Sequence, residues 1–346
     1  MSQPFTQILE KISKSENLSE DEASAAMELI LSGAVSTEEI SAFLVAMRMK
    51  GETISELTSF VKVMRDAAIT VDVDTKKAVD LCGTGGDKSG TFNISTAAMF
   101  VVAGADVPVL KHGNRSVSSK SGSFDVLKKL GAEPNLTKEQ VEKLYNETGM
   151  AFMFAPNFHP AMKFVMPARR ALKIRTFFNM LGPLLNPAGV ERQVIGAFSK
   201  NAAGQMIQIL GNLKAERAFT LNSHDGLDEV SLASNSEIFE LNSRISTTSE
   251  VFDPVSLGYK KVDMEELMGG NASINAAIIK KIYQGTSTDA QRNIVELNAA
   301  FAIRASGKTD NLQDAKTLAS ESIDSGKALK KLNMFIEETQ KLSKAG

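Results

Sequence analysis

Apolar residues recur every three or four positions through the first 70 residues of the chain, the spacing that lets a helix bury one face. Phe5, Ile8 and Ile12 form the first such stripe. Three further helix starts are predicted where a hydroxyl residue precedes a glutamate by three positions: Ser19 with Glu22, Ser36 with Glu39, and Thr53 with Glu56. The pattern predicts a small all-α domain of four helices over residues 1–72.

From residue 78 the pattern changes to short apolar runs that alternate with helical segments. This alternation predicts a large α/β domain over residues 78–346, with a mostly parallel central sheet flanked by helices. The polar stretch 72–77 is the expected linker. Residues 230–262 alternate more in polarity, and we expect antiparallel strands there. The predicted parallel strands lie in AVDLC (78–82), VPVLK (107–111), AFMFA (151–155), RQVIGAF (192–198) and RAFTL (217–221).

The composition is that of an ordinary globular protein, with 43% hydrophobic and 23% charged residues in a chain of 346. Because 39 basic residues nearly balance 41 acidic ones, the net charge is -2. No broad basic surface is expected, which argues against nucleic acid and anionic lipid as partners. Any phosphate site would have to be local.

Neither a secretory signal nor a membrane span is predicted. Residues 1–18 mix charged with apolar positions, and the most apolar stretch, residues 97–110, is shorter than the roughly 20 residues that a bilayer requires. The single cysteine, Cys82, cannot form an internal disulfide, which suits a cytoplasmic location. Because it lies in an apolar run, we expect a buried strand residue rather than a nucleophile.

A glycine-rich loop, GTGGDKSGTFNIST (residues 83–96), follows the first predicted strand and leads into a helix expected from about Ser95. Glycines let backbone amides turn toward an anion, and the helix start adds its positive end. A dinucleotide fingerprint would need glycine where Lys88 stands, and a Walker A loop would need glycine before that lysine, where Asp87 stands. The loop therefore predicts a phosphate site of another kind, with side chains from Thr91, Asn93, Ser95 and Thr96.

A second polar loop, KHGNRSVSSKSGS (residues 111–123), follows the second predicted strand. Arg115 can bind a phosphate through two parallel hydrogen bonds, Lys111 adds charge, and the serines donate hydrogen bonds. In parallel sheets, ligands bind beyond the carboxyl ends of the strands, where this loop is expected. The loop predicts phosphate binding, while His112 could equally be structural or contact a substrate.

The segment FAPNFHPAMKFVMPARRALKIRTFFNMLGPLLNP (residues 154–187) contains His159, Arg169, Arg170 and Arg175. A helix is expected from Pro160, and over the ten positions to Arg169 it would direct His159 and Arg169 toward similar sides. Arg169 could pair with a small carboxylate, although the residues alone favour an exposed helix cation. The apolar end of the segment reads as a rigid connection.

Three carboxylates, Asp225, Asp228 and Glu229, gather in HDGLDEVSL (residues 224–232) after the fifth predicted strand. Acidic loops are often only solvated. Here the carboxylates lie at the predicted ligand edge, where other loops call for a phosphate-bearing ligand. We favour the interpretation that these carboxylates hold Mg2+, which in turn binds the phosphate-bearing molecule, because carboxylate oxygens are hard donors.

These four segments together resemble the anthranilate phosphoribosyltransferases of tryptophan biosynthesis, and the similarity runs in order through almost the whole chain. The resemblance implies the fold shared with thymidine phosphorylase, in which helices from about residues 161–186 join the small helical domain. It also implies a homodimer formed through the helical domains. The implied activity is Mg-dependent transfer of the phosphoribosyl group of phosphoribosyl pyrophosphate to the amine of anthranilate, with loss of pyrophosphate.

Carried over by position, the resemblance implies three sets of site residues. The phosphoribosyl pyrophosphate site would comprise Gly83, Gly86, Asp87, Thr91, Asn93, Ile94, Ser95, Thr96, Lys111, His112, Gly113, Asn114, Arg115, Ser116, Val117, Ser118, Ser119 and Ser123. The anthranilate site and its entry path would comprise Gly83, Asn114, His159, Arg169 and Gly182. Two Mg2+ ions are implied per active site, one held by Ser95 and Glu229 and the other by Asp228 and Glu229.

We expect no dedicated general base, because the arylamine of anthranilate is neutral near pH 7 and needs only to be oriented. Two alternatives stay open. A pyrimidine nucleoside phosphorylase would share the fold, but it needs one phosphate site rather than a pyrophosphate site with two metals. A non-catalytic relative that binds nucleic acid would show lost motif residues and a basic surface.

Overall fold

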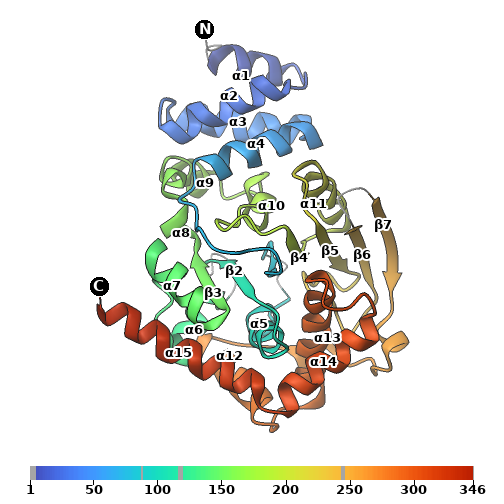
Figure 1. The fold of residues 1–346 in the computed structure, drawn as a ribbon. Helices are drawn as coiled ribbons and strands as arrows, with labels where there is room; N and C mark the ends of the chain where they lie inside the picture. The colour runs from blue at the N-terminus through green and yellow to red at the C-terminus, as the bar shows by residue number, and fades with distance from the viewer. Residues whose placement is uncertain (1–4, 87–88, 116–119, 243–245, 346) are drawn as a thin grey trace.

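The computed structural model describes residues 5–86, 89–115, 120–242 and 246–345 (Figure 1). In the first of these ranges, four helices precede the first strand and lie together at one end of the molecule, as the apolar stripes predicted. Each of the three predicted capping boxes is present with both of its hydrogen bonds. The helices are α1 (Phe5–Ser13), α2 (Glu20–Ser32), α3 (Thr37–Lys50) and α4 (Ile54–Asp66).

The described strands form a mixed sheet in the order β1-β4-β5-β6-β7 and a separate parallel pair, β2 and β3. Strands β1, β4 and β5 run parallel, whereas β6 and β7 are antiparallel additions, as the polar alternation predicted. A single bridge between Val79 and Val109 places β2 beside β1. The strands are β1 (Asp80–Gly83), β2 (Val109–Gly113), β3 (Met150–Phe154), β4 (Arg192–Gly196), β5 (Arg217–Ser223), β6 (Ser236–Asn242) and β7 (Ser246–Phe252).

Helices pack on both sides of the strands, which confirms the predicted α/β architecture. Helix α11 contacts β5 and β6, while α13 contacts β4 and β5 and also packs against α5. The helices are α5 (Ile94–Gly104), α6 (Ser123–Leu130), α7 (Lys138–Thr148), α11 (Lys200–Asn212), α12 (Ala272–Tyr283), α13 (Asp289–Ala305), α14 (Leu312–Asp324) and α15 (Lys327–Ala345).

The expectation of one helix from Pro160 is wrong. A 3-10 helix, η1 (Pro160–Phe164), comes first, and α9 (Met166–Leu172) follows it. Because proline has no N–H, it is tolerated only at the first positions of a helix. Pro160 and Pro167 therefore each lie at the start of a separate helix. Lys173, in the left-handed region at φ 52°, ends α9. His159 and Arg169 therefore do not share a helix face. The remaining short helices are α8 (Ala155–Phe158), α10 (Phe178–Leu181) and the 3-10 helix η2 (Gly182–Leu184).

The connection formed by α9 and α10 lies between the N-terminal helices and the sheet (Figure 1). Phe177, just before α10, packs with its ring centroid 4.9 Å from that of Phe60 and 6.2 Å from that of Phe43. All three rings are buried in one apolar cluster that also reaches α11. Residues from the middle of the chain thus complete the core of the helical part, while the boundaries 1–72 and 78–346 stay a prediction.

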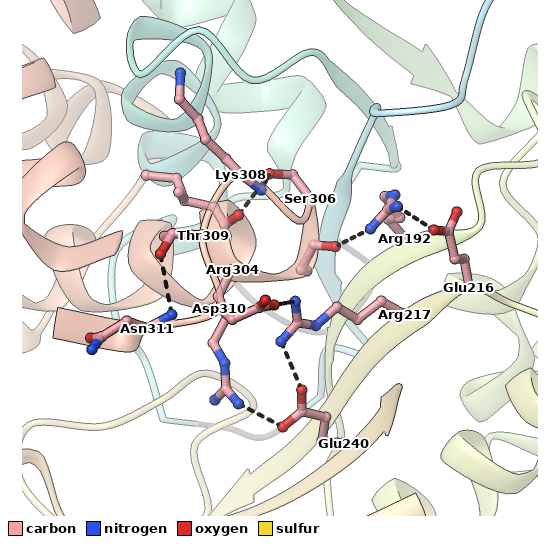
Figure 2. A network of polar contacts seen from close by, with 12 residues as sticks. Arg192, Glu216, Arg217, Glu240, Arg304, Ser306, Lys308, Thr309, Asp310 and Asn311 are labelled. Atoms are coloured by element: carbon pink, nitrogen blue, oxygen red, sulfur yellow. Dashed lines mark hydrogen bonds and ion pairs between the residues drawn. The ribbon is translucent and has the colours of Figure 1, made fainter. Parts of the chain in front are cut away.

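A charged network fastens the connection between α13 and α14 to the amino ends of the parallel strands (Figure 2). Arg217, the first residue of β5, pairs with Glu240 at 3.0 Å and with Asp310. Arg304 donates to the second carboxylate oxygen of Glu240 at 2.8 Å. Because the predicted ligand loops leave the opposite ends of these strands, the network is structural support.

Candidate active site

The carboxyl ends of β1 and β4 meet at two glycines. Gly83 and Gly196 are partners in the parallel register, and Asp228 from the loop after β5 packs against both. A Cβ atom on Gly83 would collide with the Asp228 carboxylate, and one on Gly196 with the Asp228 backbone. Gly85 donates its N–H to Asp228 Oδ2 at 2.7 Å. The glycine-rich loop and the acidic loop, far apart in sequence, are therefore joined here.

Beside this junction is a small cavity lined by the residues predicted to hold Mg2+. Ser95, Asp228 and Glu229 line it, together with Leu81, Cys82, Val194, Gly196, Leu221 and Asn298. One hydroxyl and two carboxylates are hard oxygen donors of the kind that Mg2+ prefers. Within the described residues no group of three or more His, Cys, Asp and Glu side chains could hold a metal. Mg2+ is commonly bound by one or two carboxylates, with substrate phosphates and water completing its shell.

Lys111 reaches into the interior next to this cavity. Its Nζ donates to the carbonyl oxygen of Leu81 and, at 3.2 Å, to Ser95 Oγ. The side chain is fully buried, and burial lowers the pKa of Lys111, although Asp80, Asp228 and Glu229 counteract the shift. The ammonium group thus contacts the predicted metal ligand Ser95 in this structure.

Asp80 anchors the strand ends to the connection between the two parts of the molecule. Its carboxylate accepts from Asn186 Nδ2 at 2.8 Å and from the His112 N–H at 3.3 Å. Asn186 Nδ2 also donates to the carbonyl of Leu110 at 2.8 Å. Burial raises the pKa of Asp80 to about 6, against the opposing effect of Lys111. The network fixes β1, β2 and residues 183–187 relative to one another.

The first turn of α5 links the glycine-rich loop to the loop after β2. Thr96 Oγ1 donates to Ser123 Oγ at 3.1 Å, and Asn93 Nδ2 donates to the carbonyl of Ser121 at 3.0 Å. Thr91 Oγ1 lies 3.3 Å from Ser89 Oγ. Ile94 is fully buried beneath this turn. The two loops predicted to bind phosphate are therefore adjacent in the fold.

The basic loop brings Arg115 over an aromatic pair. Its guanidinium carbon lies 4.3 Å from the ring centroid of Phe124 and 5.5 Å from that of Phe154. Asn114 Oδ1 accepts from the Arg115 N–H at 2.7 Å. Gly113, at the end of β2, has no room for a Cβ because the Phe152 ring lies against it. The rings support the guanidinium, whose planar set of N–H donors can bind phosphate.

His112 and His159 lie side by side, with ring centroids 5.1 Å apart. The His159 Nε2 atom is 3.0 Å from the carbonyl oxygen of Leu185. Burial and the neighbouring His159 lower the pKa of His112 to about 3, and burial lowers the pKa of His159. Among the described side chains, His112 Nε2 is a buried nitrogen without a hydrogen-bond partner. Burial thus favours the neutral form of both imidazole rings.

Arg169 and Gly182 flank the short helix α10. The Arg169 guanidinium lies 5.6 Å from the centroid of Phe178, and burial lowers its pKa. Arg169 is half-buried rather than the exposed cation that the residues alone favoured. A Cβ on Gly182 would meet no atom within 4 Å, so open space lies beside its backbone.

Five residues of the predicted phosphate site lie outside the described residues: Asp87, Ser116, Val117, Ser118 and Ser119. Sequence reasoning gave no role at the site to two further residues, Gly196 and Arg175. Gly196 is the last residue of β4, and its contact with Asp228 depends on strand order. Arg175 donates to the carbonyl of Gly86 and stacks on Phe198 at 4.5 Å. The available signal for Gly196 was a glycine inside the predicted strand run 192–198.

Comparison with known proteins matches this architecture over nearly its full length. A family model described as "Glycosyl transferase family, a/b domain" matches residues 75–329, and one described as "Glycosyl transferase family, helical bundle domain" matches residues 6–68. An anthranilate phosphoribosyltransferase of Salinibacter ruber is 47% identical over 331 residues, which cover 94% of this chain and 96% of that protein. The chain belongs to the anthranilate phosphoribosyltransferase family.

Solved structures of the family agree with this assignment. The anthranilate phosphoribosyltransferase of Thermus thermophilus superposes with a TM-score of 0.91 at 35% identity, covering 96% of this chain and 99% of that one. The Saccharomyces cerevisiae enzyme in complex with PRPP and Mg superposes with a TM-score of 0.90 at 27% identity, covering 98% of both chains. Within the described residues, no helix is both long and apolar enough to cross a bilayer.

Proposed function

We propose that this chain transfers the phosphoribosyl group of phosphoribosyl pyrophosphate to the amine of anthranilate, releasing pyrophosphate, in tryptophan biosynthesis. The observation that carries the proposal is the junction of the glycine-rich loop with the acidic loop through Gly85 and Asp228. A phosphate-binding loop and carboxylates suited to Mg2+ thereby share one place at the carboxyl ends of the strands.

The phosphates of the donor would bind between the glycine-rich loop and the basic loop, which the Asn93 and Thr96 contacts hold together. Backbone amides at the start of α5 and the Arg115 guanidinium supply hydrogen bonds to oxyanions. The sequence resemblance adds Asp87 and residues 116–119 to this proposed site. The other proposed residues are Gly83, Gly86, Thr91, Ile94, Ser95, Lys111, His112, Gly113, Asn114 and Ser123.

Ser95, Asp228 and Glu229 would hold Mg2+, and we propose two ions per site, as the sequence resemblance implied. When bound, Mg2+ neutralises charge that develops on the departing pyrophosphate. Asp228 is held toward the glycine-rich loop by the Gly85 N–H, so its carboxylate is positioned by the fold. Such preorganised charge costs no rearrangement during the reaction.

Anthranilate would lie beside Gly182, where open space adjoins the backbone, with Arg169 facing its carboxylate and with Gly83, Asn114 and His159 nearby. Burial of Arg169 strengthens an ion pair with a carboxylate by lowering the local dielectric. We assign no residue as a general base, because a neutral arylamine needs orientation rather than deprotonation before it attacks.

We also propose a homodimer formed through the helical parts, a cytoplasmic location and a division into residues 1–72 and 78–346. Met49 is 82% exposed at the end of α3, and Ile174 is also exposed. Arg48 donates to the backbone carbonyl of Arg175 at 2.8 Å, which brings the end of α3 close to the segment that follows α9. Sedimentation of the wild type against Met49→Glu would test the dimer: a monomeric wild type contradicts it.

The decisive assay follows anthranilate fluorescence with purified protein, phosphoribosyl pyrophosphate, and Mg2+ present or chelated. Loss of the signal that requires Mg2+ and matches the pyrophosphate released is the expected result. No turnover by folded protein would reject the proposal and direct attention to phosphorolysis of pyrimidine nucleosides and to nucleic-acid binding.

The metal assignment is tested by the double variant Asp228→Asn/Glu229→Gln. Turnover should fall at least about 100-fold, since both changes remove anionic Mg2+ ligands. Asp225→Asn is the matched control, because Asp225 lies on the same loop but accepts hydrogen bonds from Leu227 and Ser231 outside the cavity. Full activity of the double variant would overturn the metal assignment.

A further inference from the structure

The segment from the 3-10 helix η4 (Met264–Leu267) to the start of α12 packs against the glycine-rich loop. Gly269 donates to the carbonyl of Gly90 at 2.9 Å, and Thr91 pairs with Met268 in an isolated antiparallel bridge. A Cβ on Gly269 would meet the backbone of Phe92 at 2.6 Å. The contact is therefore close and made mainly by backbone.

Two asparagine amides continue this contact to the basic loop. Asn275, in the first turns of α12, is 2% exposed. Its Oδ1 accepts from the Gly270 N–H at 2.7 Å, and its Nδ2 donates to Asn93 Oδ1 at 2.9 Å. Asn93 Nδ2 in turn donates to the carbonyl of Ser121 at 3.0 Å. A single chain of hydrogen bonds thus joins three segments of the site.

The direction of this chain is fixed by its ends. A backbone N–H can only donate and a backbone carbonyl can only accept, so Gly270 and Ser121 determine how both amides are turned. Asn275 must present its NH2 group to Asn93. A carboxylate at position 275 would place an oxygen against Asn93 Oδ1, and the chain would break there.

The hydrogen bond from Asn275 keeps the Asn93 side chain from capping its own helix. Asn93 is the N-cap residue of α5, an 11-residue helix, yet its side chain makes no capping hydrogen bond. Asparagine is among the best N-caps because its oxygen accepts from the first-turn N–H groups. In this structure that oxygen accepts from Asn275 instead. The amides of the first turn are thereby left to a ligand rather than to the cap.

We infer that Asn275 is a positioning residue for the phosphoribosyl pyrophosphate site: it withholds Asn93 from capping α5 and aligns the glycine-rich loop with the basic loop. Asn275 acts through Asn93 and does not itself touch the substrate. This inference rests on the proposed function. It assigns a role in donor binding to α12, a helix that the sequence motifs did not include.

The test compares Asn275→Asp with Asn271→Asp, two amide-to-carboxylate changes four positions apart. Asn271 only accepts, from the N–H groups of Ser273 and Ile274, so a carboxylate can replace it. Calorimetric titration with phosphoribosyl pyrophosphate and Mg2+ should show about tenfold weaker binding for Asn275→Asp and no change for Asn271→Asp. The KM for anthranilate should change less than about twofold, a split that a general loss of structure would not produce.

A double-mutant cycle with Asn93→Ala and Asn275→Ala asks whether the two residues act together. In the Asn93→Ala background, the second change should weaken donor binding less than about twofold. Additive losses, or wild-type binding by Asn275→Asp, would overturn the inference. A wild type that binds no phosphoribosyl pyrophosphate would overturn the proposed function, and this role for Asn275 with it.

Discussion

The N–H of Gly85 donates to the carboxylate of Asp228 at 2.7 Å, across 143 positions of the chain. The bond joins the loop after β1 to the loop after β5. Because the parallel strands β1, β4 and β5 are neighbours, their carboxyl ends bring these loops to one edge. The predicted phosphate site and the predicted Mg2+ ligands become a single site through this contact.

Gly196→Ala should disrupt the acidic loop. The new Cβ would meet the backbone carbonyl of Asp228, which cannot rotate away as a side chain could. We expect a loss of about 1–3 kcal/mol in the free energy of unfolding. Displacing Asp228 should also lower turnover on the order of 100-fold. Chemical denaturation and steady-state kinetics of the same preparation measure both effects.

Gly204→Ala serves as the control for this substitution. Gly204 lies in α11, where a Cβ would make ordinary contact with the Phe239 ring at 3.6 Å. Alanine in a helix interior should raise the free energy of unfolding by roughly 0.5–1 kcal/mol and leave the kinetics unchanged. Equal behaviour of the two variants would contradict the crowding argument at Gly196.

Gly182→Ala should weaken the binding of anthranilate without lowering the stability of the fold. Its φ is -46°, which alanine adopts readily, and a Cβ there meets nothing within 4 Å. We expect the melting temperature to stay the same or rise slightly, and the KM for anthranilate to increase about tenfold because the methyl group enters the open space. An unchanged KM for anthranilate would place the acceptor elsewhere.

Arg169→Ala should weaken anthranilate binding more than Arg170→Ala. Arg169 is half-buried over Phe178, whereas the adjacent Arg170 is exposed. Loss of a partly desolvated ion pair with the anthranilate carboxylate should raise its KM by about 10- to 100-fold. Arg170→Ala should stay within about twofold of wild type. The reverse order in an anthranilate titration would remove Arg169 from the acceptor site.

The pH dependence of stability should carry the signature of His112. Burial lowers the pKa of His112 to about 3 from an ordinary value of 6.5, so its contribution is present above pH 6.5 and is lost as the pH falls toward 3. Relative to His112→Gln, the wild type should lose about 2 kcal/mol of unfolding free energy between pH 7 and pH 5.

Asp80 titrates with the opposite sign. Burial raises the pKa of Asp80 to about 6, so protonation below that pH favours the folded state. Because Asp80 is present in both proteins, its contribution cancels when wild type and His112→Gln are compared at each pH. Urea denaturation gives the unfolding free energy of each protein at each pH. If the difference between wild type and His112→Gln stays constant from pH 7 to pH 5, His112 is not buried as a neutral ring.

Local signals were sufficient for most of the elements and for the prediction of the site loops. The stripes and capping boxes predicted α1–α4 because a helix start depends on residues only three or four positions apart. The strand and helix alternation predicted the α/β part, and glycines and hydroxyls after predicted strands led to the two loops that we propose as the phosphate site. The Pro160 helix was wrong since a second proline, Pro167, divides that segment.

The sequence by itself determined most of the helices and strands and the family that the chain resembles, and it predicted which loops carry phosphate and metal chemistry. Only the tertiary structure decided that the Asp228 backbone packs against Gly196, which leaves no room for a Cβ there, and that Asn275 donates to Asn93. Both contacts depend on strand order and on the packing of α12. Residues 182 positions apart carry no local pattern that announces their contact, because proximity at that separation is created by the packing of whole elements.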